Sequence, residues 1–295
     1  MSRTFFLCLL AGFVGAAFNT LVAHAAPPTR MNVCTGGETG NYYKAGIKIA
    51  EQAKGVLDLN IVSTKGSMEN LDKLSDGSCD AAIVQSDAYL VYKKTNPKSD
   101  LDLERAAALY PEYVHLVCNR ASGITRVTQL SDKTPVAVGP IGSGSSVTWD
   151  SFVLADPATY KRIPTLPLAG TRAATKVAEG TDATCLLYVA GLKTTYMMEV
   201  NDGVGDKVVL VKADDGDMDK ILDPKKKPVY TYEKIPGGTY SKIQDGMFSS
   251  VKTISTSAIL VVNTKWIDAN DRAYDSFLKA QIHAEAGIMK MVTPE

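Results

Sequence analysis

The sequence predicts an α/β protein with two lobes, and three observations lead to this fold class. From Met31 onward, short apolar strand-like runs alternate with glycine-rich turns and with segments of helical periodicity, which is typical of parallel α/β architecture. The same pattern starts afresh at Pro135. Without a leader at residues 1–25, about 270 of the 295 residues remain, and usual domain sizes divide such a chain into two units.

The leader has the layout of a cleavable secretory signal. Arg3 is followed by an apolar run over residues 5–18 and by the small-residue site Ala23-His24-Ala25. The run is too short for a membrane anchor, because about 20 consecutive apolar residues are needed to span a bilayer. We therefore expect cleavage near Ala25 and export of the mature chain.

The charge balance excludes nucleic acid as a partner. The chain holds 32 Lys and Arg against 32 Asp and Glu, and loss of Arg3 with the signal leaves a net charge of −1. Nucleic-acid binders depend on a basic surface for much of their affinity. Any affinity for a small anion must therefore come from local geometry.

The first lobe is predicted as a series of strand-turn-helix units. Between Tyr42 and Ala53, apolar residues recur at helical spacing. The alternation at residues 57–61 is that of a half-exposed strand, whereas the continuous apolar run at 81–84 suits a strand covered on both faces. We expect strands at residues 31–34, 57–61 and 81–84, each followed by a helix.

The rest of the chain repeats these elements. Further strands are expected at residues 113–118, 135–138, 183–189 and 258–262, with a helix after residue 142 and a terminal helix around Phe277. The charged tract at 214–219 lacks the register of a calcium loop, so we expect a solvated loop there.

Four cysteines follow the leader: Cys34, Cys79, Cys118 and Cys185. In an oxidising compartment they allow three complete pairings. Each lies in or beside an apolar strand-like run, where buried cysteine commonly acts as a small hydrophobic side chain. We expect unpaired core positions. No Cys-x-x-Cys is present that would indicate a zinc or redox site.

Several predicted strands end in glycine- and hydroxyl-rich turns that open helices. The first N–H groups of a helix lack internal partners and carry partial positive charge, so such turns can bind anions. In parallel α/β sheets these turns gather at the carboxyl ends of the strands. We expect residues 35–43, 64–70, 85–87 and 142–146 to line one cleft for a carboxylate. Each turn alone also has a structural interpretation, with Ser67 and Asp87 as helix N-caps.

Motifs of common enzymes are missing from the sequence. It contains no Gly-x-Ser-x-Gly elbow and no Gly-Lys-Ser or Gly-Lys-Thr phosphate loop. Two histidines, His115 and His283, follow the leader, which leaves little for a histidine-assisted nucleophile. We expect no enzyme activity, no cofactor and no metal. An exported hydrolase with Ser143 or Ser145 as nucleophile is a distant alternative.

Six ordered segments resemble the TAXI family, the solute-binding subunits of tripartite ATP-independent periplasmic (TRAP) transporters. The first three are Cys34-Thr-Gly-Gly-Glu-Thr-Gly-Asn-Tyr-Tyr43, Ser63-Thr-Lys-Gly-Ser-Met-Glu-Asn70 and Gln85-Ser-Asp87. The others are Leu109-Tyr-Pro-Glu-Tyr-Val-His-Leu116, Val138-Gly-Pro-Ile-Gly-Ser-Gly-Ser145 and Ile235-Pro-Gly-Gly-Thr-Tyr240. Together they cover nearly all of the mature chain.

The resemblance implies a two-lobed periplasmic binding protein of type II, the Venus-flytrap arrangement, with a ligand cleft between the lobes. Such a protein captures a small carboxylate, which we expect to be glutamate, a related amino acid, or a C4–C5 dicarboxylate or keto acid. It delivers the ligand to the membrane subunits of a TRAP permease in the periplasm, and we expect a monomer. Carried over motif by motif, the ligand-binding residues are Thr35, Gly36, Gly37, Tyr43, Ser67, Asn70, Gln85, Asp87, Ser143, Gly144, Ser145, Tyr188 and Gly191.

This chain departs from the family's pattern at two charged residues. Glu38 places a negative charge in the first turn, and Lys65 replaces a common glycine in the second, where it could compensate; Lys65 therefore joins the predicted ligand-binding set. We expect one lobe at residues 26–118 with 254–295 and the other at 119–253. The same fold could instead serve an ABC importer or a sensor. Valine at Gly37 or Gly144 is expected to weaken binding.

Overall fold

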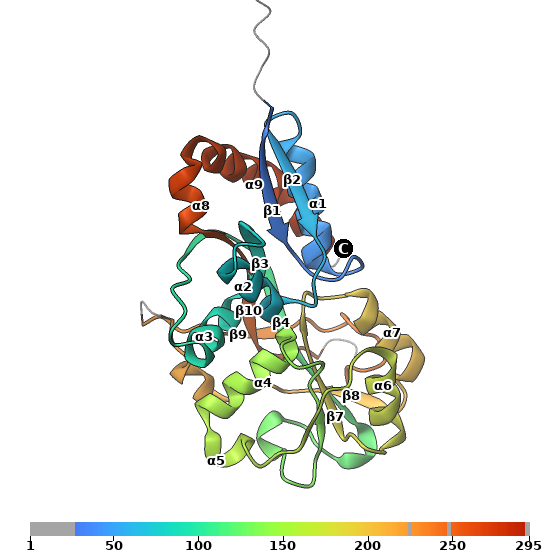
Figure 1. Cartoon of the computed structure of the whole chain (residues 1–295). Coiled ribbons are helices and arrows are strands. Elements are labelled where there is room, and N and C mark those ends of the chain that lie inside the picture. Colours follow the sequence, from blue (N-terminus) through green and yellow to red (C-terminus); the bar gives the residue numbers. More distant parts are fainter. Residues whose placement is uncertain (1–26, 224–225, 247–248, 293–295) are drawn as a thin grey trace, which may run out of the picture.

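The computed structural model describes residues 27–223, 226–246 and 249–292, and it has two lobes, one above the other in Figure 1. The predicted signal lies outside the described residues. Within those that are described, no helix combines the length and apolar character needed to cross a membrane. Strands and helices alternate through both lobes, which confirms the predicted α/β class.

The first lobe is built on three parallel strands, β1 (Thr29–Cys34), β2 (Leu57–Val62) and β3 (Ala81–Gln85). Its helices are α1 (Asn41–Ala53), α2 (Ser67–Ser75), α3 (Ser86–Thr95), α8 (Thr264–Ala269) and α9 (Asp271–Val292). Side chains of β3 alternate between two cores. Ala81 and Ile83 pack with α1 and α9, and Ala82 and Val84 pack with α2 and α3. This strand is therefore covered on both faces, as its continuous apolar run predicts.

The second lobe contains shorter strands and more helices. The strands are β5 (Val136–Ala137), β6 (Thr165–Leu166), β7 (Cys185–Ala190), β8 (Val208–Val211) and β9 (Thr231–Ile235). The helices are α4 (Gly144–Ala155), α5 (Pro157–Tyr160), α6 (Gly170–Glu179) and α7 (Thr195–Val204). Apolar cores lie on both faces of its sheet. The expected loop at 214–219 overlaps a 3-10 turn at Gly216–Lys220.

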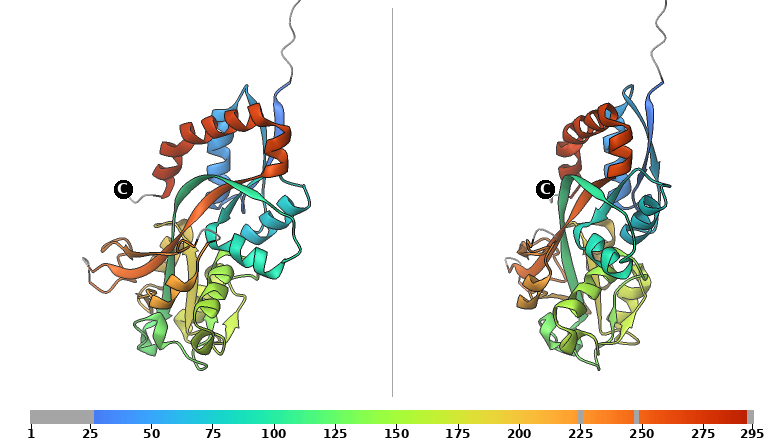
Figure 2. Two further views of the ribbon diagram at one scale, coloured as in Figure 1. Left: turned by 90° about the vertical axis from the view of Figure 1, so that its left-hand side faces the viewer. Right: turned by 60° about the vertical axis from the view of Figure 1, so that its left-hand side comes forward.

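Two long strands, β4 (Leu103–Asn119) and β10 (Val251–Asn263), join the lobes. They pair antiparallel, with register shifts between Ala258 and Ile259 and between Leu260 and Val261. Figure 2 shows the two strands passing together from one lobe to the other. The sheet has the order β2-β1-β3-β10-β4-β7-β5-β6, with β8 and β9 paired to β4 and β10. β4 starts well before the predicted residue 113 because β10 pairs with its first half. The predicted lobe boundaries fall within these two strands and stay a prediction.

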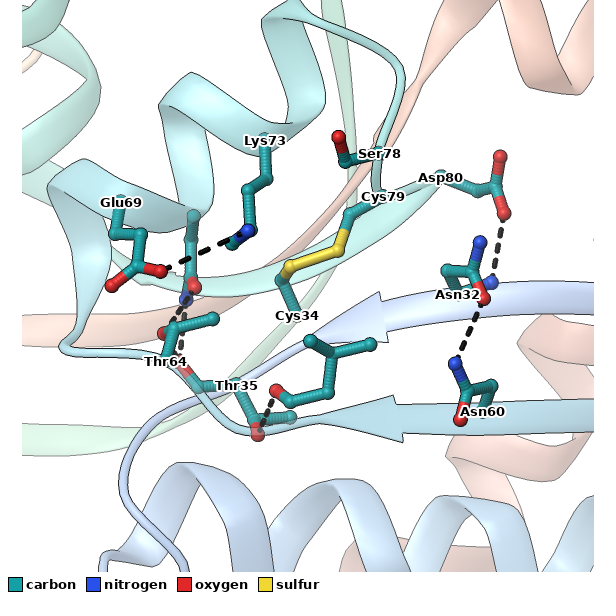
Figure 3. The surroundings of a disulfide bond; sticks show 12 residues. Asn32, Cys34, Thr35, Asn60, Thr64, Glu69, Lys73, Ser78, Cys79 and Asp80 are labelled. Atoms are coloured by element: carbon teal, nitrogen blue, oxygen red, sulfur yellow. Dashed lines mark hydrogen bonds and ion pairs between the residues drawn. A yellow bond between two sulfur atoms is a disulfide. The ribbon is translucent and has the colours of Figure 1, made fainter.

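The four cysteines form two disulfides, so the expectation of unpaired cysteines is wrong. Cys34, at the end of β1, is bonded to Cys79, with Cα atoms 5.9 Å apart (Figure 3). Cys118 of β4 is bonded to Cys185 of β7, directly opposite in the antiparallel register. Pairing depends on which strands are neighbours, and local sequence patterns do not encode that. Cys34 and Cys79 pack in one core with α2 and α3, and Cys118 and Cys185 pack in another core with α4 and α5.

Candidate functional site

A cleft of about 730 Å³ lies between the two lobes. The first lobe lines it with the turn before α1, the starts of α1 and α2, and the end of β3, while the second lobe contributes the start of α4, the end of β7 and the start of α7. The residues that line it include Gly36, Glu38, Gly40, Tyr42, Lys44, Gly66, Ser67, Gln85, Glu112, Gly144, Tyr188, Thr194, Thr195, Tyr196 and Glu199.

Helices α1 and α2 both start at this cleft without a side-chain cap. Their N-cap residues are Gly40 and Gly66, which leave the first N–H groups of each helix without a side-chain acceptor. Gly66 has a φ of 126°, in the region that favours glycine. Ser67, an N-cap candidate from the sequence, is instead the first helical residue, and its Oγ accepts a hydrogen bond from the Gln85 N–H at 2.9 Å.

Five of the predicted ligand-binding residues line the cleft: Gly36, Ser67, Gln85, Gly144 and Tyr188. Gln85 connects the lobes, because its Nε2 donates a hydrogen bond to Oγ1 of Thr148 at 2.8 Å. Gly144 lies against the same side chain, and a Cβ at this position would collide with Oε1 of Gln85. The structure therefore brings together the predicted turns of both lobes.

Thr35 and Asn70 are buried behind the cleft surface, where they hold its turns in place. Thr35 Oγ1 donates to the Val62 carbonyl at 2.9 Å. Asn70 Nδ2 donates to the carbonyls of Thr35 and Ile83 at 2.6 and 2.7 Å. Figure 3 shows Thr35 beside the disulfide of the first lobe. These two residues thus shape the cleft from outside its lining.

Asp87 is fully buried and links the lobes rather than capping α3, whose N-cap is Gln85. Its carboxylate accepts hydrogen bonds from the Tyr230 hydroxyl at 2.5 Å, from Thr148 Oγ1 at 2.9 Å and from Gln85 Nε2 at 2.9 Å. Burial raises the pKa of Asp87, whereas these donors lower it. Because Thr148 belongs to α4, the cluster holds α3 against the second lobe.

Other predicted residues lie outside the cleft lining. Gly37 and Lys65 are exposed, and Tyr43 is half-buried. Gly191 is buried, and its α-carbon faces Val292 of α9. None of these four residues belongs to the lining of the cleft in the described part of the chain.

Ser143 and Ser145 also serve the backbone. Ser143 is the N-cap of α4 and accepts a hydrogen bond from the Ser146 N–H at 3.3 Å. Ser145 Oγ accepts one from the Val189 N–H at 3.1 Å. Both line a separate cavity of about 100 Å³ in the second lobe. Ser145 thereby fixes the end of β7, whose neighbouring residue Tyr188 reaches the cleft.

Sequence reasoning missed Glu112 of β4. Its side chain lines the cleft although the residue is only 5% exposed, and its Oε2 accepts a hydrogen bond from the Tyr42 hydroxyl at 2.8 Å. Burial raises the pKa of Glu112 to about 8 against the opposing effect of this bond. The available signal was an acidic residue within the mostly apolar run at residues 106–118, where unpaired carboxylates are rare.

The start of α7 was missed as well. Thr194, Thr195, Tyr196 and Glu199 line the cleft from the second lobe. Thr194 caps the helix by accepting a hydrogen bond from the Met197 N–H at 3.4 Å. This segment has no glycine-rich turn, so the signal used for the other helix starts was absent. The Thr-Thr pair before a helical apolar pattern was the available sign of an N-terminus.

Most of the chain matches the model of a known protein family. Residues 33–275, well over half of the chain, match the model of the NMT1-like family. The chain belongs to the NMT1-like family. Membership in the TAXI family stays a prediction.

Solved structures show the same architecture as this NMT1-like chain. The periplasmic aliphatic sulphonate binding protein SsuA from Escherichia coli has a TM-score of 0.54 at 13% identity, over 90% of this chain and 75% of that one. The GluR0 ligand-binding core from Nostoc punctiforme, solved with L-glutamate, has a TM-score of 0.52 at 9% identity, over 90% and 99%. Lactococcal OpuAC, solved with glycine betaine, has a TM-score of 0.50 at 12% identity, over 89% of each chain. These likenesses confirm the two-lobed periplasmic binding-protein fold.

The cleft of this NMT1-like protein carries more acidic than basic side chains. Glu38, Glu112 and Glu199 line it against Lys44, and arginine is absent from the described lining. The Lys65 side chain, expected to balance Glu38, is exposed outside the lining. An anionic group in the cleft would therefore depend on backbone N–H groups and hydroxyls rather than on a strong cation.

Proposed function

We propose that this NMT1-like chain is a periplasmic solute-binding protein that captures a small carboxylate between its lobes and delivers it to the membrane subunits of a TRAP-type permease. The observation that carries the proposal is the pair of uncapped helix starts, at Gly40 and Gly66, that open onto one cleft. The cleft volume of about 730 Å³ is typical of small-molecule sites. The predicted residues Gly36, Ser67, Gln85, Gly144 and Tyr188 form the proposed contact set.

Helix dipoles alone are too weak to hold such a ligand. One helix terminus stabilises a nearby anion by about 0.3–1 kcal/mol in an exposed setting, whereas micromolar affinity needs roughly 8 kcal/mol. Exclusion of water strengthens polar contacts. The contacts of Gln85 with Gly144 and Thr148 bring the lobes together around the cleft, and this closure supplies the remaining affinity.

Isothermal titration of refolded, ligand-stripped protein tests the proposal. Amino acids, dicarboxylates and keto acids are titrated in turn, and we expect at least one to bind with micromolar or better affinity. A protein that binds none of them is not a carboxylate receptor. Native mass spectrometry of protein purified without added ligand would identify a retained ligand by its mass.

An ABC importer is the second candidate partner. It is favoured by a solved structure with a TM-score of 0.52 at 11% identity, which is the substrate-binding protein of an amino acid ABC transporter. Uptake of the bound ligand into membrane vesicles distinguishes the two. A TRAP permease uses an ion gradient without ATP, so a requirement for ATP would assign the chain to an importer.

We propose binding without catalysis. Ser143 and Ser145, the candidate nucleophiles of an exported hydrolase, are engaged in backbone hydrogen bonds. His115 instead contacts the Tyr113 carbonyl and the Tyr240 hydroxyl. Labelling with a fluorophosphonate probe is expected to fail, and labelling that is lost in a Ser143→Ala variant would support the hydrolase.

A further inference from the structure

A buried acid lies within the proposed carboxylate site. The Glu112 side chain lines the cleft but is 5% exposed. Its Oε2 accepts the hydrogen bond from Tyr42, and within the described part of the chain its Oε1 has no hydrogen-bond partner. A carboxyl oxygen that borders the cleft and lacks a protein donor is available to a group on the ligand.

Among the residues that the structure describes, the groups that interact with Glu112 supply no positive charge. They are Tyr42 of α1, Tyr110 of its own strand, Tyr188 of β7 and, at longer range, Asp87 of α3. Glu38, Lys44 and Glu199 also line the cleft, and all three are exposed. Burial without a cation disfavours the ionised carboxyl, so the pKa of Glu112 is raised to about 8 and the group carries a proton at neutral pH.

We propose, on the basis of the function proposed above, that the carboxyl of Glu112 receives the ammonium group of the ligand, so that the cleft selects amino acids over keto acids and dicarboxylates. The carboxylate of the same ligand lies at the uncapped starts of α1 and α2. The ammonium offers a positive charge and N–H donors to both carboxyl oxygens. A second carboxylate would have to share the proton of Glu112, and a ketone oxygen would accept one hydrogen bond from it. Neither group can make the charge-assisted contacts with both carboxyl oxygens that an ammonium makes with the ionised Glu112.

Capture of the ammonium requires the Glu112 proton to leave for the solvent. In the ligand-free protein, the ionised fraction of Glu112 rises about tenfold with each unit of increasing pH, up to its pKa of about 8. The affinity for an amino acid therefore rises by nearly the same factor between about pH 6 and pH 7, and it levels off above about pH 8. Nearly one proton is released for each ligand bound at neutral pH.

Matched pairs of ligands test the selectivity by isothermal titration. The pairs are L-glutamate with 2-oxoglutarate, L-alanine with pyruvate, and L-leucine with 4-methyl-2-oxopentanoate, and succinate serves as the dicarboxylate. In each pair the ammonium is replaced by a ketone oxygen. We expect the tightest ligand to be an amino acid that binds at least about tenfold more tightly than its keto acid.

Two outcomes separate the inference from the proposed function. If none of these acids binds, the function itself fails. If a keto acid or succinate binds as tightly as the best amino acid or more tightly, the carboxylate receptor stands and the role of Glu112 is overturned.

Variants locate the effect at one carboxyl. Glu112→Gln keeps the size and the hydrogen bond with Tyr42, and we expect it to lose at least about tenfold in amino-acid affinity and to lose the pH dependence between about pH 6 and pH 8. Glu104→Gln is the matched control, because Glu104 lies on the same strand but is exposed and outside the cleft lining. Equal losses in both variants would contradict the inference.

A measurement on the unmodified protein does not depend on how the variant folds. Titration of the tightest amino acid in two buffers of different ionisation enthalpy gives the number of protons released on binding. We expect nearly one proton at neutral pH. Release of no proton would contradict the ion pair with Glu112.

Discussion

At Gly144 the absence of a side chain lets the second lobe approach Gln85 of the first. A Cβ there would collide with Gln85 Oε1, whereas Gly37 has open space at the same position. We predict that Gly144→Val displaces Gln85 and lowers ligand affinity about tenfold or more, since each lost hydrogen bond is worth about 1 kcal/mol and water enters the cleft. Isothermal titration measures the change. Gly37→Val, which the sequence predicts to weaken binding as well, is the control, because in the structure its side chain would meet open space outside the cleft lining. An equal loss there would mean that the contact at Gly144 is unimportant.

His115 makes stability depend on pH. It is fully buried, its Nδ1–H donates to the Tyr113 carbonyl, and its Nε2 accepts from the Tyr240 hydroxyl at 2.9 Å. Burial lowers the pKa of His115 to about 4, so between about pH 6.5 and pH 4 the unfolded chain binds more protons than the folded one. The free energy of unfolding therefore falls as the pH falls through this range, by up to roughly 3 kcal/mol from this group.

The variant His115→Gln removes that titration. Thermal unfolding followed from about pH 7 to pH 4 should show a smaller loss of Tm in the variant than in the parent protein. His283→Gln is the control, since His283 is exposed on α9. If Tm falls equally with pH in the parent protein and in His115→Gln, the buried imidazole does not contribute to the pH dependence of stability.

Individual residues of the cleft were predictable where the backbone decides their role. Gly36, Ser67 and Gly144 were found because glycine and serine mark strand-to-helix turns in sequence. Glu112 was not, because its proximity to Tyr42 depends on β4 lying beside the first lobe. Thr35 and Asn70 occur in the right motifs, but the direction of their side chains depends on hydrogen bonds to Val62 and Ile83.

Strands and helices act on the cleft through the segments that fix their ends. The Cys34–Cys79 disulfide lies directly before the turn that contains Gly36, and it closes a sequence separation of 45 residues. We predict that a Cys34→Ser/Cys79→Ser variant loses about 2–4 kcal/mol of unfolding free energy and also binds ligand more weakly, because the turn becomes mobile. Thermal unfolding and isothermal titration give the two values.

The second disulfide provides a matched comparison. Strands β4 and β7 pair from Tyr113 with Ala190 at one end to Cys118 with Cys185 at the other. Ala190 lines the cleft, so the disulfide lies at the end of the pairing that is farther from it. A Cys118→Ser/Cys185→Ser variant should lose similar stability while it keeps its ligand affinity. If this variant alone bound ligand more weakly, the second disulfide rather than the first would be the one that supports the cleft.

Secondary structure was predictable where periodicity is local. The helical spacing between Tyr42 and Ala53 gave α1, and the alternation at 57–61 gave β2. The first half of β4 and the cysteine pairs could not be found in this way. Their partners are β10, at the far end of the chain, and strands that become neighbours only in the folded sheet.

At the scale of the whole molecule, the Asp87 cluster holds the lobes together. Tyr230, from the segment before β9, donates the 2.5 Å hydrogen bond to Asp87 of α3. Loss of a hydrogen bond to a buried charged group costs about 1.5–3 kcal/mol. We predict that Tyr230→Phe favours open arrangements, so that the radius of gyration of the ligand-free protein rises and ligand affinity falls about tenfold or more.

Small-angle X-ray scattering and isothermal titration measure these two effects. Tyr232→Phe is the control, because the Tyr232 hydroxyl donates to the Asp215 carbonyl within the second lobe and is 42% exposed. If both variants scatter like the parent protein, the cluster does not hold the lobes.

The paired strands β4 and β10 form the described connection that runs between the lobes, and their register shifts lie near the middle of β10. A hydrogen-bonded ribbon resists stretching along its strands but bends and twists readily across them. Such a ribbon would keep the two lobes at a fixed separation while the angle between them changes. Under the proposed function, we expect the bending stiffness of this ribbon, together with the Asp87 cluster, to limit how far the lobes open by thermal motion, and thus how fast a bound solute escapes.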